Sequence, residues 1–145
     1  MTPGVRTERA RAALADGGAL AVFWNTQQWR KSELFEPVRA AYDAIVPGFR
    51  AAPGNPPESG ALWGDHEREL EMAAGFAAPE SRIYEWSVKR TTAEYLDVTR
   101  TQSDHIGLSP ELRERLLAAV GSVIDQAGGS FTMPSEAQLW LARAV

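Results

Sequence analysis

The stretch Ala19-Leu20-Ala21-Val22-Phe23-Trp24 decides the fold, because it is an unbroken apolar run with the length of one β-strand. A run without polar alternation is typical of a strand that is covered on both faces, as in the parallel sheets of α/β proteins. Before it, residues 7–15 repeat their apolar positions at helical spacing, and Asp16-Gly17-Gly18 ends that helix. The sequence therefore predicts a helix, a glycine turn and a buried strand in succession.

Two further strands are predicted nearer the C-terminus. Residues 82–90 alternate, with Tyr84, Trp86 and Val88 on one side and polar or charged residues on the other. This pattern predicts a half-buried strand, which is more typical of a sheet edge than of a sheet centre. The final segment contains a third strand, predicted over residues 137–143.

Helices are predicted between these strands. After a polar start, residues 25–46 become helical and place five apolar side chains on one face: Leu34, Phe35, Val38, Tyr42 and Ile45. Residues 63–76 predict a short charged helix. Thr91-Thr92-Ala93-Glu94 has the spacing of a capping box. Ser109-Pro110 predicts another helix start, with serine as the N-cap, and Gly128-Gly129 ends that helix.

Composition limits the class of protein. The 145 residues are enough for one domain, which we expect to span 1–145 with a proline- and glycine-rich loop at 47–62. The sequence has no cysteine, which excludes thiolate chemistry, and its net charge of −4 argues against a nucleic-acid partner. No apolar run approaches the roughly 20 residues that span a bilayer, so we expect a cytoplasmic protein without membrane contact.

Motifs of common catalytic sites are missing from the sequence. It contains neither G-x-G nor G-x-S-x-G, so no dinucleotide fingerprint, P-loop or nucleophile elbow is present. His66 and His105 each lie beside an aspartate, which would allow a metal or acid–base role, but solvated surface histidines are the favoured interpretation. No catalytic residue and no metal site is assigned.

The tryptophans are the more informative residues. Trp24, Asn25 and Trp29 follow the predicted buried strand, and ligands of open α/β sheets bind beyond the carboxyl ends of the strands. These three residues are therefore candidates for lining a substrate pocket, with ordinary packing as the equal alternative. Trp86 and Trp140 are expected in the core.

The stretch Arg11-Ala-Ala-Leu-Ala-Asp-Gly-Gly-Ala-Leu-Ala-Val-Phe-Trp-Asn25 resembles the region around the fifth strand of class I S-adenosylmethionine (SAM)-dependent methyltransferases of the type 11-like group. Members commonly have proline where this sequence has Asp16. The resemblance continues through Tyr84-Glu-Trp86, Thr101-Gln-Ser-Asp-His-Ile-Gly-Leu108, and Gly128-Gly129 with the closing Leu141-Ala-Arg143.

The resemblance implies the C-terminal half of a Rossmann-like methyltransferase sheet. The three strands would be equivalent to strands 5, 7 and 6, with the last one antiparallel between the other two and helices flanking the sheet. In that family the glycine-rich turn and the acidic residue that hold SAM lie upstream of the matched region. The resemblance therefore implies no cofactor-binding residue in this sequence, and it leaves the fifth strand with an exposed edge.

Two functions follow as expectations. The first is SAM-dependent methyl transfer to a small-molecule acceptor, which enzymes drive largely by positioning the two reactants. This chain would be inactive alone, as the product of a mis-called start, a split enzyme or a remnant, unless a partner chain supplies the missing half. The alternative is a small binding module that pairs, with itself or with another chain, through the exposed strand edge.

Overall fold

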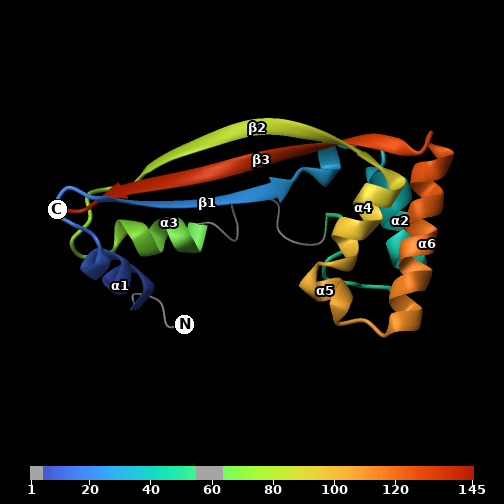
Figure 1. The fold of residues 1–145 in the computed structure, drawn as a ribbon, viewed down its shortest axis with the longest axis horizontal. Coiled ribbons are helices and arrows are strands. Elements are labelled where there is room, and N and C mark those ends of the chain that lie inside the picture. Colours follow the sequence, from blue (N-terminus) through green and yellow to red (C-terminus); the bar gives the residue numbers. More distant parts are fainter. Residues whose placement is uncertain (1–4, 55–63) are drawn as a thin grey trace. The chain divides into compact units, whose positions relative to one another are not determined.

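The computed structural model describes residues 5–54 and 64–145 (Figure 1). Its elements, in chain order, are α1 (Val5–Ala13), β1 (Ala19–Gln27), the 3-10 turn η1 (Trp29–Lys31), α2 (Phe35–Ile45), α3 (Gly64–Glu71), β2 (Glu80–Thr91), α4 (Thr92–Arg100), α5 (Ser103–Ile106), α6 (Pro110–Gln126) and β3 (Ser130–Arg143). The predicted helices and strands are all found within these residues. The strands are longer than their apolar runs, because polar residues at their ends continue the ladder.

The three strands form one open sheet in the order β1-β3-β2. β3 runs antiparallel to both of its neighbours (Figure 1). The prediction that the last strand lies antiparallel between the other two is therefore confirmed. Within the described residues, β1 and β2 each have a neighbour on one side only, which confirms both the edge position of β2 and the exposed edge of β1.

The register of β1 against β3 is fixed by hydrogen bonds at both ends of the pair. The Ala144 N–H donates to the Gly18 carbonyl, and the Gln28 N–H donates to the Pro134 carbonyl, each over 2.8 Å. Both strands advance by the same number of residues between these bonds, so the pairing carries no net bulge. Hydrogen-bonding residues alternate along an antiparallel strand. The even-numbered residues of β1 therefore direct their backbone toward β3, and the odd-numbered residues direct theirs away from it.

The chain folds into two compact units, which are described separately. Unit 1 comprises residues 1–26, 57–85 and 136–145, and unit 2 comprises residues 27–56 and 86–135. The expectation of one domain over 1–145 stays a prediction. Residues 47–54, the first part of the predicted loop, contain turns and no helix or strand, and residues 55–62 lie outside the described part of the chain.

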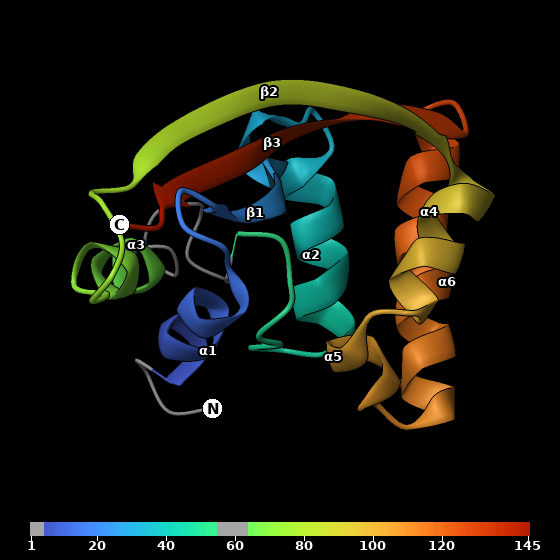
Figure 2. The ribbon, with the colours of Figure 1, turned by 60° about the vertical axis from the view of Figure 1, so that its left-hand side comes forward.

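In unit 1, α1 and α3 lie on one face of the sheet (Figures 1 and 2). The core beneath them is small. Leu70 and Trp140 are buried, and Leu20 and Val22 pack against them. This confirms the prediction that Trp140 belongs to the core.

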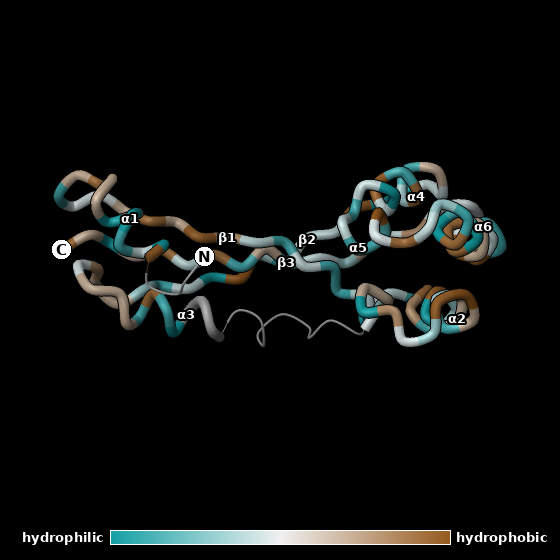
Figure 3. The backbone as a smooth tube through the Cα atoms, turned by 90° about the horizontal axis from the view of Figure 1, so that it is seen from below, coloured by the Kyte–Doolittle hydropathy of each residue, from teal (hydrophilic) through white to brown (hydrophobic). Residues whose placement is uncertain are grey.

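The prediction that β1 is buried on both faces is wrong. Its hydrophobic stretch is visible in Figure 3, yet the Phe23 side chain is 66% exposed and Trp24 is 58% exposed. Alternate side chains of a strand point to opposite faces, so Leu20 and Val22 reach the core while Phe23 lies on the other face. No described helix covers that other face in unit 1 (Figure 1).

The prediction that β2 buries the face carrying Tyr84, Trp86 and Val88 is also wrong for most of that face. Tyr84 is 50% exposed and Trp86 is 43% exposed, so Trp86 is not a core residue. Of the predicted inner face, Val88 alone packs against a described hydrophobic core. The alternation identified the strand correctly, but it could not show that most of its apolar face has no helix against it.

Unit 2 has the larger core, which α2, α4 and α6 enclose. Its buried residues are Trp29, Leu34, Val38, Tyr42, Ala52, Tyr95, Leu116, Val120, Ile124, Phe131 and Met133. The capping box of α4 is confirmed, because the Glu94 N–H donates to the Thr91 hydroxyl and the Thr91 N–H donates to the Glu94 carboxylate. The predicted Ser109 N-cap of α6 is confirmed as well.

Candidate functional site

The three candidate site residues lie in different surroundings. Trp24 and Asn25 are exposed residues of β1 in unit 1. Trp29 begins η1 in unit 2, where it is buried, stacks on Phe131 and meets the edge of Tyr95. The sequence grouped these residues by their spacing along the chain, but the structure assigns Trp29 to the packing of unit 2.

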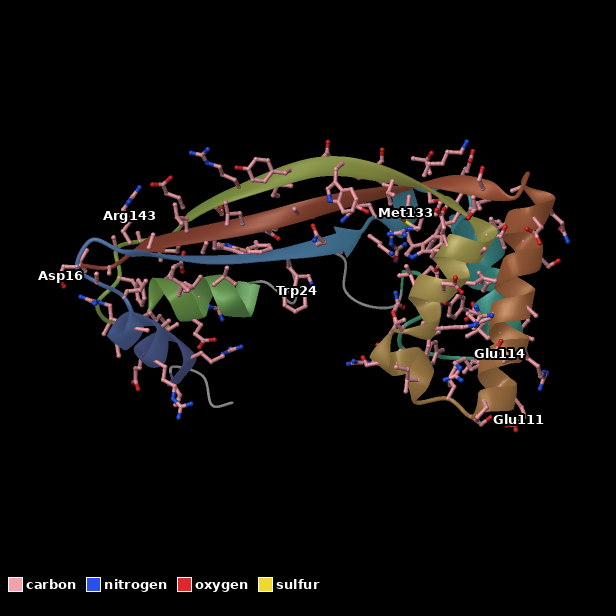
Figure 4. The ribbon with its side chains drawn as sticks, viewed as in Figure 1. Asp16, Trp24, Glu111, Glu114, Met133 and Arg143 are labelled. Atoms are coloured by element: carbon pink, nitrogen blue, oxygen red, sulfur yellow. The ribbon has the colours of Figure 1, made fainter. Side chains whose placement is uncertain are left out.

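A cavity of about 220 Å³ lies in unit 1, under the face of β1 that α1 and α3 cover. Trp24 points from β1 toward the side of α3 (Figure 4). The cavity is lined by Leu20, Val22 and Trp24 of β1, by Arg6, Thr7 and Ala10 of α1, and by Glu69 and Leu70 of α3. The sequence thus identified one of these lining residues, Trp24.

The walls of this cavity are mostly apolar. The Arg6 guanidinium pairs with the Glu69 carboxylate, so the two charges that line the cavity neutralise each other. Thr7 is buried, and the remaining lining residues are hydrophobic. This chemistry suits an uncharged aromatic or aliphatic group. The cavity therefore offers shape and apolar contact to a ligand.

A second feature of unit 1 is the open edge of β1, by which we mean its side facing away from β3. The register directs the N–H and C=O groups of Ala19, Ala21, Phe23 and Asn25 to this edge. No charged residue and no proline occurs between Gly17 and Gln28. Such residues are the usual means of preventing an edge from pairing with another strand. The open edge is therefore competent to accept a further strand.

His105 is not a surface residue, so the favoured interpretation of this histidine is wrong. It is 1% exposed in unit 2, and its Nε2 shares a hydrogen bond of 2.8 Å with the Tyr42 hydroxyl. The Tyr42 and Phe49 rings both meet the imidazole edge-on. The residues next to His105 in the sequence are polar and gave no sign that it would be buried. Its burial results from the short α5, which directs the ring toward Tyr42 of α2. The side chain of His66 lies outside the described part of the chain.

Burial sets the protonation of this pair. It lowers the pKa of His105, against a smaller opposing effect of the Asp104 carboxylate. Burial also raises the pKa of the Tyr42 phenol far above its ordinary value, and it raises the pKa of Tyr95 to about 12. All three groups are therefore neutral near pH 7, and the pair is a packed, hydrogen-bonded part of the core. The Nδ1 atom of His105 has no hydrogen-bond partner among the described residues.

Metal-ligand clusters and membrane-spanning helices are both absent from the described residues. No group of three or more histidine, aspartate or glutamate side chains among them is placed to hold a metal ion. No helix in residues 5–54 or 64–145 has the length and apolar character needed to cross a bilayer. The cavity and the open edge, both formed by β1, remain as the candidate sites.

Comparison of the sequence with models of known protein families finds no match, and comparison with curated proteins finds none either.

Proposed function

We propose that this chain is the acceptor-side portion of a SAM-dependent methyltransferase that acts on a small molecule. The observation that carries the proposal is the order β1-β3-β2 with β3 antiparallel between its neighbours. This is the order that the resemblance implies for strands 5, 7 and 6. The sequence stretch that carries the resemblance ends in β1, the strand that contributes Trp24 to the cavity and leaves its edge open.

The lining of the cavity in unit 1 favours a methyl acceptor over SAM itself. The cofactor carries an adenosine, a sulfonium and an amino-acid group, which need several polar partners. The cavity offers apolar walls and a carboxylate that is already paired with Arg6. Under the proposal, SAM is held by residues outside this sequence, in the same polypeptide or in another. Trp24 would face the methyl acceptor, whereas Asn25 lies on the opposite face of β1 and Trp29 packs in unit 2.

Calorimetric titration of SAM tests this proposal in two steps. The chain alone is expected to give no binding heat, and micromolar binding would overturn the assignment of the cofactor to residues outside it. The second titration adds a polypeptide encoded upstream of, or next to, the coding sequence and carrying a glycine-rich turn after a predicted strand. SAM should bind to the mixture more tightly than to that polypeptide alone, and equal affinity would refute the proposal.

A non-catalytic interaction module is the second candidate, and the uncharged open edge of β1 favours it. Strand addition at a sheet edge is a common mode of protein recognition, in which backbone hydrogen bonds supply the affinity. The two functions differ in one observable outcome. An interaction module pairs through β1 without any methyl transfer, whereas the methyltransferase portion transfers a methyl group once its cofactor-binding part is present.

A further inference from the structure

We infer that two copies of this chain pair through their open edges, with the β1 strands antiparallel about a two-fold axis at Phe23. The result is a continuous six-stranded sheet in the order β2-β3-β1-β1-β3-β2. The inference rests on the interaction-module function and names its partner, which is a second copy of this chain. It does not depend on methyl transfer. A companion polypeptide that adds to β1 would compete for the same edge.

The hydrogen-bonding register makes β1 self-complementary. The strand runs from Ala19 to Gln27, so Phe23 is its middle residue. The bonds to β3 show that Phe23 is one of the residues with N–H and C=O groups on the open edge. Antiparallel pairing about Phe23 places every edge-facing residue opposite another edge-facing residue, for example Ala21 opposite Asn25 of the second copy. No backbone group of the central pairs is then left without a partner.

The side chains on the edge agree with this register. Phe23, which is 66% exposed, would lie opposite Phe23 of the second copy, where each ring covers part of the other. Small Ala21 lies opposite the uncharged Asn25, so no like charges meet there. Burying apolar surface and stacking aromatic rings both favour the pair.

Charge repulsion does not oppose the antiparallel pair. No residue of β1 carries a charge, and Asp16, which lies just before the strand, is paired with Arg11 over 3.6 Å.

Light scattering on the full chain measures the expected association. The 15.9 kDa chain should give twice its own mass at high micromolar concentration. Ala21→Pro removes an edge N–H while leaving the β1–β3 bonds intact, and Phe23→Lys places like charges on the two-fold axis. Both variants should have the monomer mass. The matched control is Ile83→Lys, which alters a residue of β2 that is 58% exposed and should leave the dimer intact.

Circular dichroism identifies variants that fail to fold, so that loss of the dimer is read from folded protein only. A wild-type chain that stays monomeric at high micromolar concentration would overturn the inference. A dimer that survives both Ala21→Pro and Phe23→Lys, or one that Ile83→Lys dissociates, would overturn it as well. Binding of SAM changes neither the register nor these masses, so this test and the calorimetric test of the proposed function can fail separately.

Spin labels then test the position of the axis. Because the chain has no cysteine, a single Phe23→Cys or Ala19→Cys substitution gives a single labelled site. Pairing about Phe23 places labels at position 23 side by side, which broadens the electron paramagnetic resonance spectrum. Labels at position 19 would lie eight residues apart along the strands, about 27 Å at 3.4 Å per residue. Broadening at 19 without broadening at 23 would refute the two-fold at Phe23.

Discussion

The two units of this chain show how differently one sequence can bury its hydrophobic residues. Unit 2 encloses a continuous core between capped helices, and eight of its hydrophobic residues, from Val38 to Met133, are at most 1% exposed. Unit 1 buries Leu70 and Trp140, retains a cavity of about 220 Å³ beside them, and leaves Phe23 and Tyr84 largely exposed. Unit 2 therefore has the more extensive hydrophobic core, and the candidate binding surfaces belong to unit 1. Functional sites are commonly drawn from the less stable parts of a protein.

The largest expected effect is that of Trp140→Ala in unit 1. Trp140 is fully buried and is one of the two buried residues of its cluster. Truncating such a side chain costs about 3–5 kcal/mol, and unit 1 has little other core to compensate. Hydrogen exchange measured by mass spectrometry should show loss of protection in α1, α3 and β1, with α6 still protected.

Leu116→Ala is the matched change in unit 2, because Leu116 is also fully buried. It should cost about 2–5 kcal/mol. Protection should fall throughout α2 and α6, because they share one core. If Trp140→Ala lowered protection in α6 as much as in β1, the proposed difference between the units would be wrong.

Tyr42→Phe is expected to cost about 1–3 kcal/mol, because it leaves His105 buried without its hydrogen-bond partner. Urea denaturation monitored by circular dichroism measures this loss. The control is Tyr84→Phe, which removes a hydroxyl from a residue that is half exposed and should change the free energy of unfolding by less than about 0.5 kcal/mol. Equal effects of the two variants would show that the buried pair contributes nothing to unit 2.

Thr91→Ala should cost about 1 kcal/mol, because it removes the hydroxyl that caps α4. The same denaturation experiment measures it, with the exposed Ser87→Ala as the control. The effect should be confined to unit 2, where α4 packs against α6. A loss of protection in α1 and α3 of similar size would contradict the separate packing of the units.

The smallest expected effect near neutral pH is the titration of His105. Its folded-state pKa lies below its unfolded value of about 6.5, because burial disfavours the charged ring. Below that unfolded value the unfolded chain takes up a proton that the folded chain does not. The stability is therefore fully present above about pH 6.5 and declines as the pH falls toward the folded pKa.

Urea denaturation between pH 8 and pH 5 should show this decline. His105→Phe should reduce the slope. A slope that persists undiminished in His105→Phe would contradict the burial of His105.

Local signals of the sequence predicted the elements, because their causes are local. The capping box at Thr91, the N-cap at Ser109 and the apolar face of α2 depend on residues three or four positions apart. The burial of a strand face depends instead on what packs against it. That is why the apolar run ending in Phe23 and Trp24 predicted a strand correctly but its burial wrongly.

The same distinction between local and long-range causes applies to the candidate site. Trp24 was identified as a lining residue because it belongs to the strand that forms the cavity. Arg6 and Glu69 were missed, because they come from two helices whose sequences do not show which charges will meet. The hydrogen-bond register, and with it the open edge at Phe23, depends on pairing with β3 more than 100 residues away and has no local signal.

Amide exchange along β1, followed by NMR at low and at high protein concentration, tests the central claim most directly. The amides of Leu20, Val22 and Trp24 should exchange slowly at both concentrations, because they bond to β3. Those of Ala21 and Phe23 should exchange fast in dilute solution and slowly in concentrated solution, where a second copy pairs with the edge. Fast exchange of Ala21 and Phe23 at every concentration would contradict pairing through β1, and slow exchange even at the lowest concentration would contradict the open edge.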